Sequence, residues 1–105
     1  MIKVTLLVMD KGFVSLEAKG HADSAPYGQD LICAAISAII LGGFNALDDD
    51  STSYDVEAKP GHAYLKSLKT PSQHDSIVLE TIVKQIESVA ASYPDNVKLE
   101  RKKAQ

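Results

Sequence analysis

The sequence contains a single cysteine, Cys33, so no disulfide can form within the chain. A free thiol is typical of a reducing compartment, and we therefore expect a cytoplasmic protein. Basic residues are not in surplus, because the formal net charge is −3. Direct binding of nucleic acid requires a concentration of Lys and Arg, so we expect none.

Long apolar runs and targeting segments are also missing. The longest nearly apolar run covers residues 31–44, about one and a half helical turns too short to cross a bilayer. The first residues alternate in polarity like a strand and lack signal-peptide architecture. There is no internal repeat. With 105 residues, of which 45% are hydrophobic, we expect one domain over residues 1–105, with one modest core and no membrane contact.

Two kinds of periodicity predict seven elements. Alternating apolar residues predict strands at 2–8, 14–18, 54–58, 63–68 and 97–99. An apolar repeat close to four residues predicts helices at 29–47 and from about 71 to 93. The order ββαββαβ has no repeated βαβ unit. The predicted fold class is therefore α+β, a mixed β-sheet packed with two main helices.

Several polar segments are expected to be solvated or to end elements. Residues 70–73 have the form of a capping box, with Pro71 at the first position of the second helix. His74 follows in the first turn, where we expect it in solvent. The acidic run 48–50 lacks the spacing of cation ligands, which favours a solvated loop over a metal site. The basic run 101–103 is expected to be a solvated tail.

The first predicted helix is apolar on nearly every side. A helix of this kind must be covered on more than one face. One sheet and one amphipathic helix leave part of it open, so we expect a homodimer in which the partner covers the rest. Gly42 and Gly43 near its end lower helix propensity, and we expect them to allow close backbone packing or a kink.

The side chains suited to covalent chemistry gather in residues 20–37. His21 stands twelve residues before Cys33. Asp30, Cys33 and Ser37 are spaced three and four apart, so they share one face of the predicted helix. A cysteine attacks as the thiolate, which helix N-termini and imidazoles both favour. The alternatives are a cysteine that is only a small buried hydrophobe and a histidine that is only solvated.

Residues 22–29, between His21 and Cys33, have no apolar period and contain Pro26 and Gly28. They predict a loop. A loop between a base and a nucleophile is where a substrate would be admitted. The alternative is an ordinary connection, since loops of this length are common.

The motif Gly20-His21-Ala22-Asp23, followed by Tyr27-Gly28-x-Asp30-x-x-Cys33-Ala34-x-x-Ser37, resembles the ribosomal-processing cysteine protease family Prp. The resemblance covers the whole chain in length and element order. It implies a bacterial cytoplasmic endopeptidase that forms dimers. Its implied substrate is the short N-terminal extension of large-subunit ribosomal protein number twenty-seven.

The resemblance implies that Cys33 is the nucleophile and His21 the base, with no metal or cofactor. Gly20, Asp30 and Ser37 occupy supporting positions of the motif. Asp30 either caps the helix or orients His21. Ser37 either bonds near the thiol or bonds back to its own helix. Backbone N–H groups at the helix start are expected to stabilise the oxyanion.

Two further residues are expected to serve the substrate. Tyr27 would form one wall of an apolar groove, and Gly28 would be the hinge of the loop, since glycine adopts new backbone conformations most easily.

Two functions other than proteolysis stay open. One is a non-catalytic ribosome-associated assembly factor, in which His21 and Cys33 are structural. The other is a thiol redox sensor, which the absence of a resolving cysteine in this chain disfavours. Alkylation of the thiol separates proteolysis from assembly binding, because binding need not depend on the thiol.

Overall fold

The described part of the chain contains five strands and two helices in the predicted order ββαββαβ. The computed structural model describes residues 1–9, 12–20, 27–48, 53–59 and 61–103, and of residues 27–30 it describes the backbone. The elements are β1 (Ile2–Met9), β2 (Gly12–Lys19), α1 (Tyr27–Asn45), β3 (Tyr54–Lys59), β4 (His62–Ser67), α2 (Gln73–Ser92) and β5 (Val97–Lys103). The predicted α+β class is confirmed.

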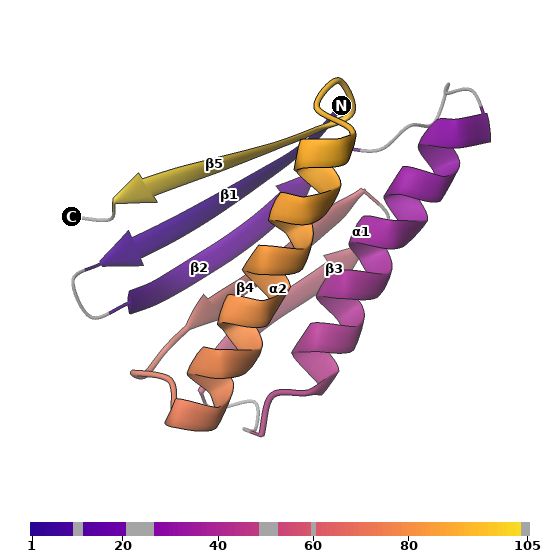
Figure 1. Cartoon of the computed structure of the whole chain (residues 1–105). Coiled ribbons are helices and arrows are strands. Elements are labelled where there is room, and N and C mark those ends of the chain that lie inside the picture. The colour runs from indigo at the N-terminus through magenta and orange to yellow at the C-terminus, as the bar shows by residue number, and fades with distance from the viewer. Residues whose placement is uncertain (10–11, 21–26, 49–52, 60, 104–105) are drawn as a thin grey trace.

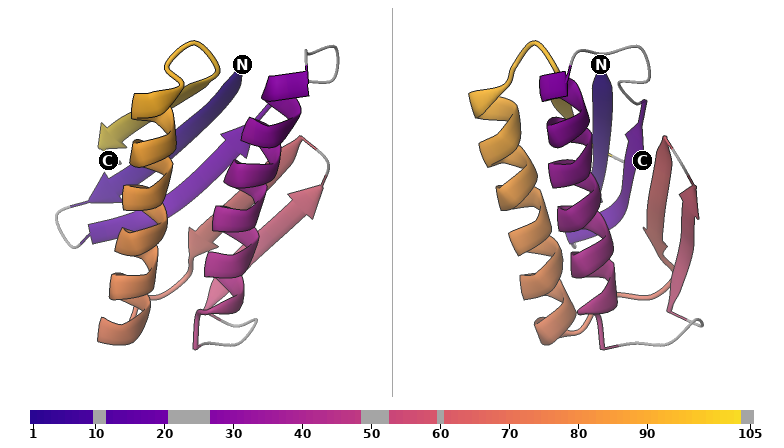
Figure 2. Two further views of the ribbon diagram at one scale, coloured as in Figure 1. Left: turned by 45° about the vertical axis from the view of Figure 1, so that its right-hand side comes forward. Right: turned by 90° about the vertical axis from the view of Figure 1, so that its right-hand side faces the viewer.

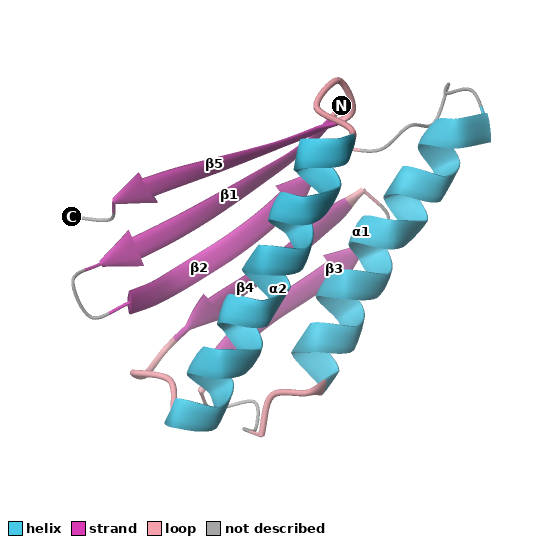
Figure 3. Cartoon of the chain, viewed as in Figure 1, coloured by secondary structure: helices cyan, strands magenta, loops and turns pink. Residues whose placement is uncertain are grey.

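The strands form one mixed sheet in the order β3-β4-β2-β1-β5. β5 pairs parallel with β1, and the other three pairings are antiparallel. Both helices lie on the same face of this sheet (Figure 1). The side view in Figure 2 shows the two resulting layers, and Figure 3 separates them by colour. The hairpin of β3 and β4 therefore forms one edge of the sheet, and β5 forms the other.

The core lies between the helices and one face of the sheet. Alternate residues of each strand point into it, as the two-residue period of a strand requires. Among the α1 residues whose side chains are described, 31–45, the buried ones are Ile32, Ile36 and Ile40, spaced four apart. The other members of the core are Ile2, Val4, Leu6, Leu16, Ala18, Tyr54, Leu65, Leu79, Ile82, Val83, Ile86 and Val97. Most of the alternating apolar residues of β1 and β2 are thus buried, whereas on the edge strand β3 Tyr54 is buried and Val56 is 50% exposed.

The start of α1 differs from the prediction. The helix begins at Tyr27, so Tyr27 and Gly28 are its first residues and not part of a loop. The apolar period of the helix becomes readable only at Leu31, because residues 27–30 (Tyr-Gly-Gln-Asp) contain no aliphatic side chain. The rest of the predicted loop, residues 22–26, lies outside the described residues.

The predicted basic tail is also wrong. Residues 101–103 are the end of β5, where Arg101, Lys102 and Lys103 pair with β1. Charged side chains are common on a strand at the edge of a sheet, where they discourage pairing with another chain. At the other side of the sheet, β4 ends at Ser67, so Leu68 lies just beyond the strand that was predicted to include it.

The second helix starts two residues later than predicted. Its N-cap is Ser72, whose hydroxyl accepts a hydrogen bond of 3.1 Å from the backbone N–H of Asp75. This bond satisfies one of the helix N–H groups that lack an intrahelical partner. Pro71 therefore precedes the cap. Neither α1 nor α2 is long and apolar enough to cross a membrane.

Gly43 lies where α1 packs directly against α2. A Cβ atom added at Gly43 would lie 2.3 Å from Cγ1 of Ile82, a side chain that is almost fully buried. A Cβ atom at Gly42 would meet nothing within 4 Å. Close backbone packing, one of the two roles expected for this glycine pair, therefore belongs to Gly43 alone.

We predict opposite effects for alanine at these two neighbouring positions. Gly42→Ala should raise the free energy of unfolding by roughly 0.5–1 kcal/mol, because alanine is the better helix former. Gly43→Ala should lower it by about 1–3 kcal/mol, because the added methyl group would force the buried side chain of Ile82 to shift within a packed core. Urea unfolding of both variants measures the difference, and equal effects would refute the packing argument.

Candidate active site

Cys33 lies on the side of α1 that faces the sheet and is half-buried against the core. It directly follows the buried Ile32 in the helix. Counting from Tyr27, Cys33 is the seventh helical residue. The N–H groups without an intrahelical partner are those of residues 27–30, and the field of the helix end is strongest within that first turn. If the helix start stabilises the oxyanion, as predicted, the backbone N–H groups of residues 27–30 are the ones that would do so.

A cavity of about 390 Å³ opens beside Cys33. Its walls come from α1, from the end of β2 and from the end of the hairpin formed by β3 and β4. Ser37, one helical turn after Cys33, lines the same cavity, so the two residues share one face as predicted. The apolar part of the lining consists of Ile2, Ala18, Ile36, Ile40, Leu41, Ala58 and Ala63. An apolar side chain of a bound molecule could therefore lie next to the thiol.

Gly20 brings the chain to this cavity from the end of β2. It lines the cavity, and its N–H donates a hydrogen bond of 2.9 Å to the carbonyl oxygen of Gly61. Its φ is +105°, a conformation that side chains rarely adopt. A Cβ atom here would also lie 2.3 Å from the backbone oxygen of Met1. Glycine is therefore required where the chain leaves the sheet toward His21.

The remaining predicted site residues are only partly described. His21 lies outside the described residues, but it follows a residue that lines the cavity of Cys33. Tyr27, Gly28 and Asp30 all belong to the first turns of α1, and the side chains of Tyr27 and Asp30 lie outside the described part of the structure. The structure thus brings together Cys33, Ser37 and Gly20, and the roles of the others stay predictions.

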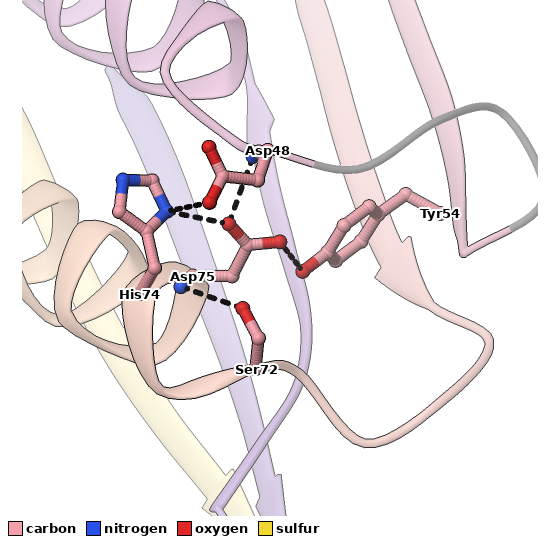
Figure 4. A network of polar contacts seen from close by, with 5 residues as sticks. All are labelled: Asp48, Tyr54, Ser72, His74 and Asp75. Carbon is pink, nitrogen blue, oxygen red and sulfur yellow. Dashed lines mark hydrogen bonds and ion pairs between the residues drawn. The ribbon is translucent and has the colours of Figure 1, made fainter.

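A second polar site, which the sequence patterns did not indicate, lies at the other end of α1 (Figure 4). The carboxylate of Asp75, 1% exposed, is at its centre. Its Oδ2 accepts a hydrogen bond of 2.7 Å from the hydroxyl of Tyr54, and its Oδ1 one of 2.9 Å from the N–H of Asp48. Nδ1 of His74 lies 3.0 Å from this Oδ1 and 3.0 Å from Oδ2 of Asp48.

The pKa values of this network reflect its hydrogen bonds. Burial by itself raises the pKa of the Asp75 carboxyl, but the bonds from Asp48, His74 and Tyr54 outweigh it, and the net shift is downward. The hydrogen bond with Asp75 raises the pKa of His74, and the charge of Asp48 acts in the same direction. His74 was expected in solvent, and its side chain is indeed 50% exposed, but its Nδ1 also lies beside two carboxylates.

Asp48, His74 and Asp75 form a group whose ligand atoms all lie within 4.8 Å of one another. Both oxygens of Asp75 already accept hydrogen bonds from protein donors. We therefore describe the group as a hydrogen-bond network. In the sequence, only the spacing Ser72-x-x-Asp75 is a local signal for part of this network, and it indicates a helix cap. The other partners come from residues far apart in the chain.

Comparison with known proteins gives consistent matches over nearly the whole chain. A family model described as cysteine protease Prp matches residues 1–98. The ribosomal processing cysteine protease Prp of Staphylococcus aureus (strain Mu50 / ATCC 700699) is 30% identical over 106 residues, which cover 97% of this chain and 100% of that protein. Its namesake in Bacillus subtilis (strain 168) is 32% identical over 97 residues, covering 86% of this chain and 87% of that protein.

Solved structures give the same result. A crystal structure of an essential ribosomal processing protease Prp from S. aureus, in complex with a substrate peptide, matches with a TM-score of 0.86 and 28% identity. It covers 97% of this chain and 100% of that chain. A second structure of that protein, with a covalently linked product peptide, matches with a TM-score of 0.84, the same identity and the same coverage.

We predict that Gly20→Ala destabilises the protein much more than Gly12→Ala. Both glycines have a φ near +105°, but a Cβ atom at Gly12 meets nothing within 4 Å. Gly12→Ala therefore measures the backbone strain, about 1–3 kcal/mol, and Gly20→Ala adds the clash with Met1. Thermal unfolding of the two variants gives the comparison, and equal melting temperatures would show that the close approach at Gly20 is unimportant.

Proposed function

Because this chain belongs to the cysteine protease Prp family and is a cysteine protease, we propose that it cuts the N-terminal extension from large-subunit ribosomal protein number twenty-seven during ribosome assembly. The proposal places the enzyme in the cytoplasm, where ribosomes assemble. The observation that carries it is the cavity of Cys33, which is lined by apolar side chains and by the glycine that precedes His21.

In the proposed mechanism, His21 accepts the thiol proton and the thiolate of Cys33 attacks the scissile carbonyl. His21 then gives its proton to the leaving amine, and water releases the acyl group from the sulfur. No metal or cofactor takes part. The related structure with a covalently linked product peptide supports a covalent step for that protein, and we extend it to Cys33 of this chain.

The supporting residues lie at different positions along α1. Ser37 lines the cavity one turn from Cys33, which favours a hydrogen bond near the thiol or the substrate. Asp30 lies early in α1, where a carboxylate near the N-terminus is favourable and where it could orient His21. Tyr27 at the helix start would border the entrance for the substrate. Gly28 has a helical backbone, so the argument for a hinge within a loop no longer applies to it.

The dimer is proposed from the surface of α1. Its outward face carries the exposed apolar residues Leu31, Ala34, Ala38 and Leu41. Their spacing of three and four residues places them on one stripe of the helix. A second copy of the chain, using the same stripe around a two-fold axis, would cover it.

Replacing Cys33 tests the proposed mechanism. We predict that Cys33→Ala abolishes cleavage of the extended ribosomal protein, measured by intact mass, with little change in melting temperature because the two side chains are similar in size. His21→Ala should slow cleavage on the order of 10²-fold or more, as expected for loss of a general base. Ser88→Ala, on the far helix, is the control and should cleave normally. Retained cleavage by Cys33→Ala would refute Cys33 as the nucleophile, and absence of cleavage by the unmodified protein would favour the non-catalytic assembly factor.

Sedimentation of charged variants tests the dimer. Leu31→Lys should convert the protein to a monomer at micromolar concentration, because a lysine cannot be buried unpaired in an apolar interface. Ile77→Lys is the matched control, since Ile77 on α2 is exposed to a similar extent, 58% against 62% for Leu31. A monomeric unmodified protein would contradict the proposal, and so would a dimer that Leu31→Lys leaves intact.

A further inference from the structure

Two consecutive elements, α1 and β3, form opposite walls of the cavity beside Cys33. α1 contributes Cys33, Ser37 and Leu41, and β3 contributes Ala58 and Lys59. β3 stands at the end of the sheet, and within the described part of the chain it pairs with β4 alone. The distance between these two walls therefore depends strongly on contacts between α1 and β3 that lie outside the cavity.

The carboxylate of Asp75 holds both ends of the segment that joins these walls. Asp48, just after α1, donates its N–H to Oδ1, and Tyr54, the first residue of β3, donates its hydroxyl to Oδ2. Figure 4 shows Asp48 and Tyr54 on either side of the same carboxylate. Because Asp75 is 1% exposed, water cannot readily replace either donor.

Asp75 is itself held firmly. It belongs to the first turn of α2, whose N-cap Ser72 accepts a hydrogen bond from the Asp75 backbone N–H and does not touch the carboxylate. His74 adds contacts of 3.0 Å to Asp75 and to Asp48, so the end of α1 is bound through a side chain as well as through its backbone. Next to this point, Gly43 lets α1 lie close to Ile82 of α2. The C-terminal end of α1 is thus anchored to α2 and, through Asp75, to β3.

A small movement at this anchor becomes larger at the thiol. Cys33 precedes the last residue of α1, Asn45, by twelve positions, which is about 18 Å along a helix axis. A tilt of about 5° around the anchored end would shift Cys33 by roughly 1.5 Å. Displacements of about 1 Å between reacting groups can cost about 10²-fold in rate.

We propose that Asp75 is a positioning residue, which sets the width of the Cys33 cavity by holding the end of α1 and the start of β3 at a fixed separation. It acts from the opposite end of the helix and touches neither substrate nor thiol. The inference rests on the proposed function in that the cavity is taken as the site of cleavage. A purely structural cap would change stability alone.

The experiment compares two ways of weakening the same region. Tyr54→Phe removes the hydroxyl that ties β3 to Asp75 and keeps the buried ring, and Asp75→Asn weakens the ties to both walls. Ser72→Ala is the matched control, because it removes a cap of α2, worth about 1 kcal/mol, and leaves the bonds from Tyr54 and Asp48 to the carboxylate. All variants are measured at a temperature where unfolding curves show them fully folded.

Two readouts are taken on each variant. The first is the steady-state cleavage of a peptide that contains the extension, with kcat and KM determined separately. The second needs no substrate: the rate of alkylation of Cys33 by a bulky aryl maleimide, divided by its rate with iodoacetamide. We expect Tyr54→Phe to lower kcat/KM at least 10-fold and to change the alkylation ratio at least 3-fold. Ser72→Ala should stay within 2-fold of the unmodified protein in both.

The outcomes separate this inference from the proposed function. An unmodified protein that does not cleave the peptide refutes the proposed function, and the alkylation ratios then test the positioning role by themselves. The positioning role is overturned if the alkylation ratios of Tyr54→Phe and Asp75→Asn both lie within 2-fold of the ratio for Ser72→Ala. If Asp75→Asn does not fold, Tyr54→Phe decides the question, since it removes only one oxygen atom.

Discussion

The structure depends on one constraint, which is that a single face of the sheet carries the apolar residues and must be covered. Val4 and Leu65 at the centre of that face are completely buried, as is Ile86 of α2. Because burial of such side chains is the main favourable contribution to folding, both helices must lie on this face. The opposite face needs no cover. The result is a two-layer fold whose functional surfaces occur where a helix meets the end of a strand.

The position of Cys33 follows from this packing. Ile32, Ile36 and Ile40 must point into the core, and each helical residue is rotated by about 100° from the one before it. Cys33 and Ser37, which follow Ile32 and Ile36, therefore lie together beside the core and not in it. Glycine at position 20 lets the backbone at the end of β2 lie close to the backbone of Met1, directly before His21.

The site around Cys33 and the site around Asp75 differ in their exposure to solvent. The thiol of Cys33 opens into a cavity, where a substrate can reach it. The carboxylate of Asp75 is closed off and has a donor for each oxygen. A buried carboxylate without such donors would be strongly destabilising, so the network around it must form whenever the protein folds. It therefore provides a fixed point at the end of α1 opposite the thiol.

The sequence by itself determined the element order and most of the apolar faces of the helices and strands, because periods of two and about four residues depend only on local geometry. It also indicated His21 and Cys33, through their residue types and spacing. Only the tertiary structure decided that β5 pairs with β1, that α1 starts at Tyr27, and that Asp75 joins Asp48 and Tyr54. Asp75 bonds to residues that precede it by 27 and 21 positions, and β5 pairs with residues that precede it by 95 positions, such as Val97 with Ile2. No local period records such distant pairings, because they form only when the whole sheet and both helices pack together.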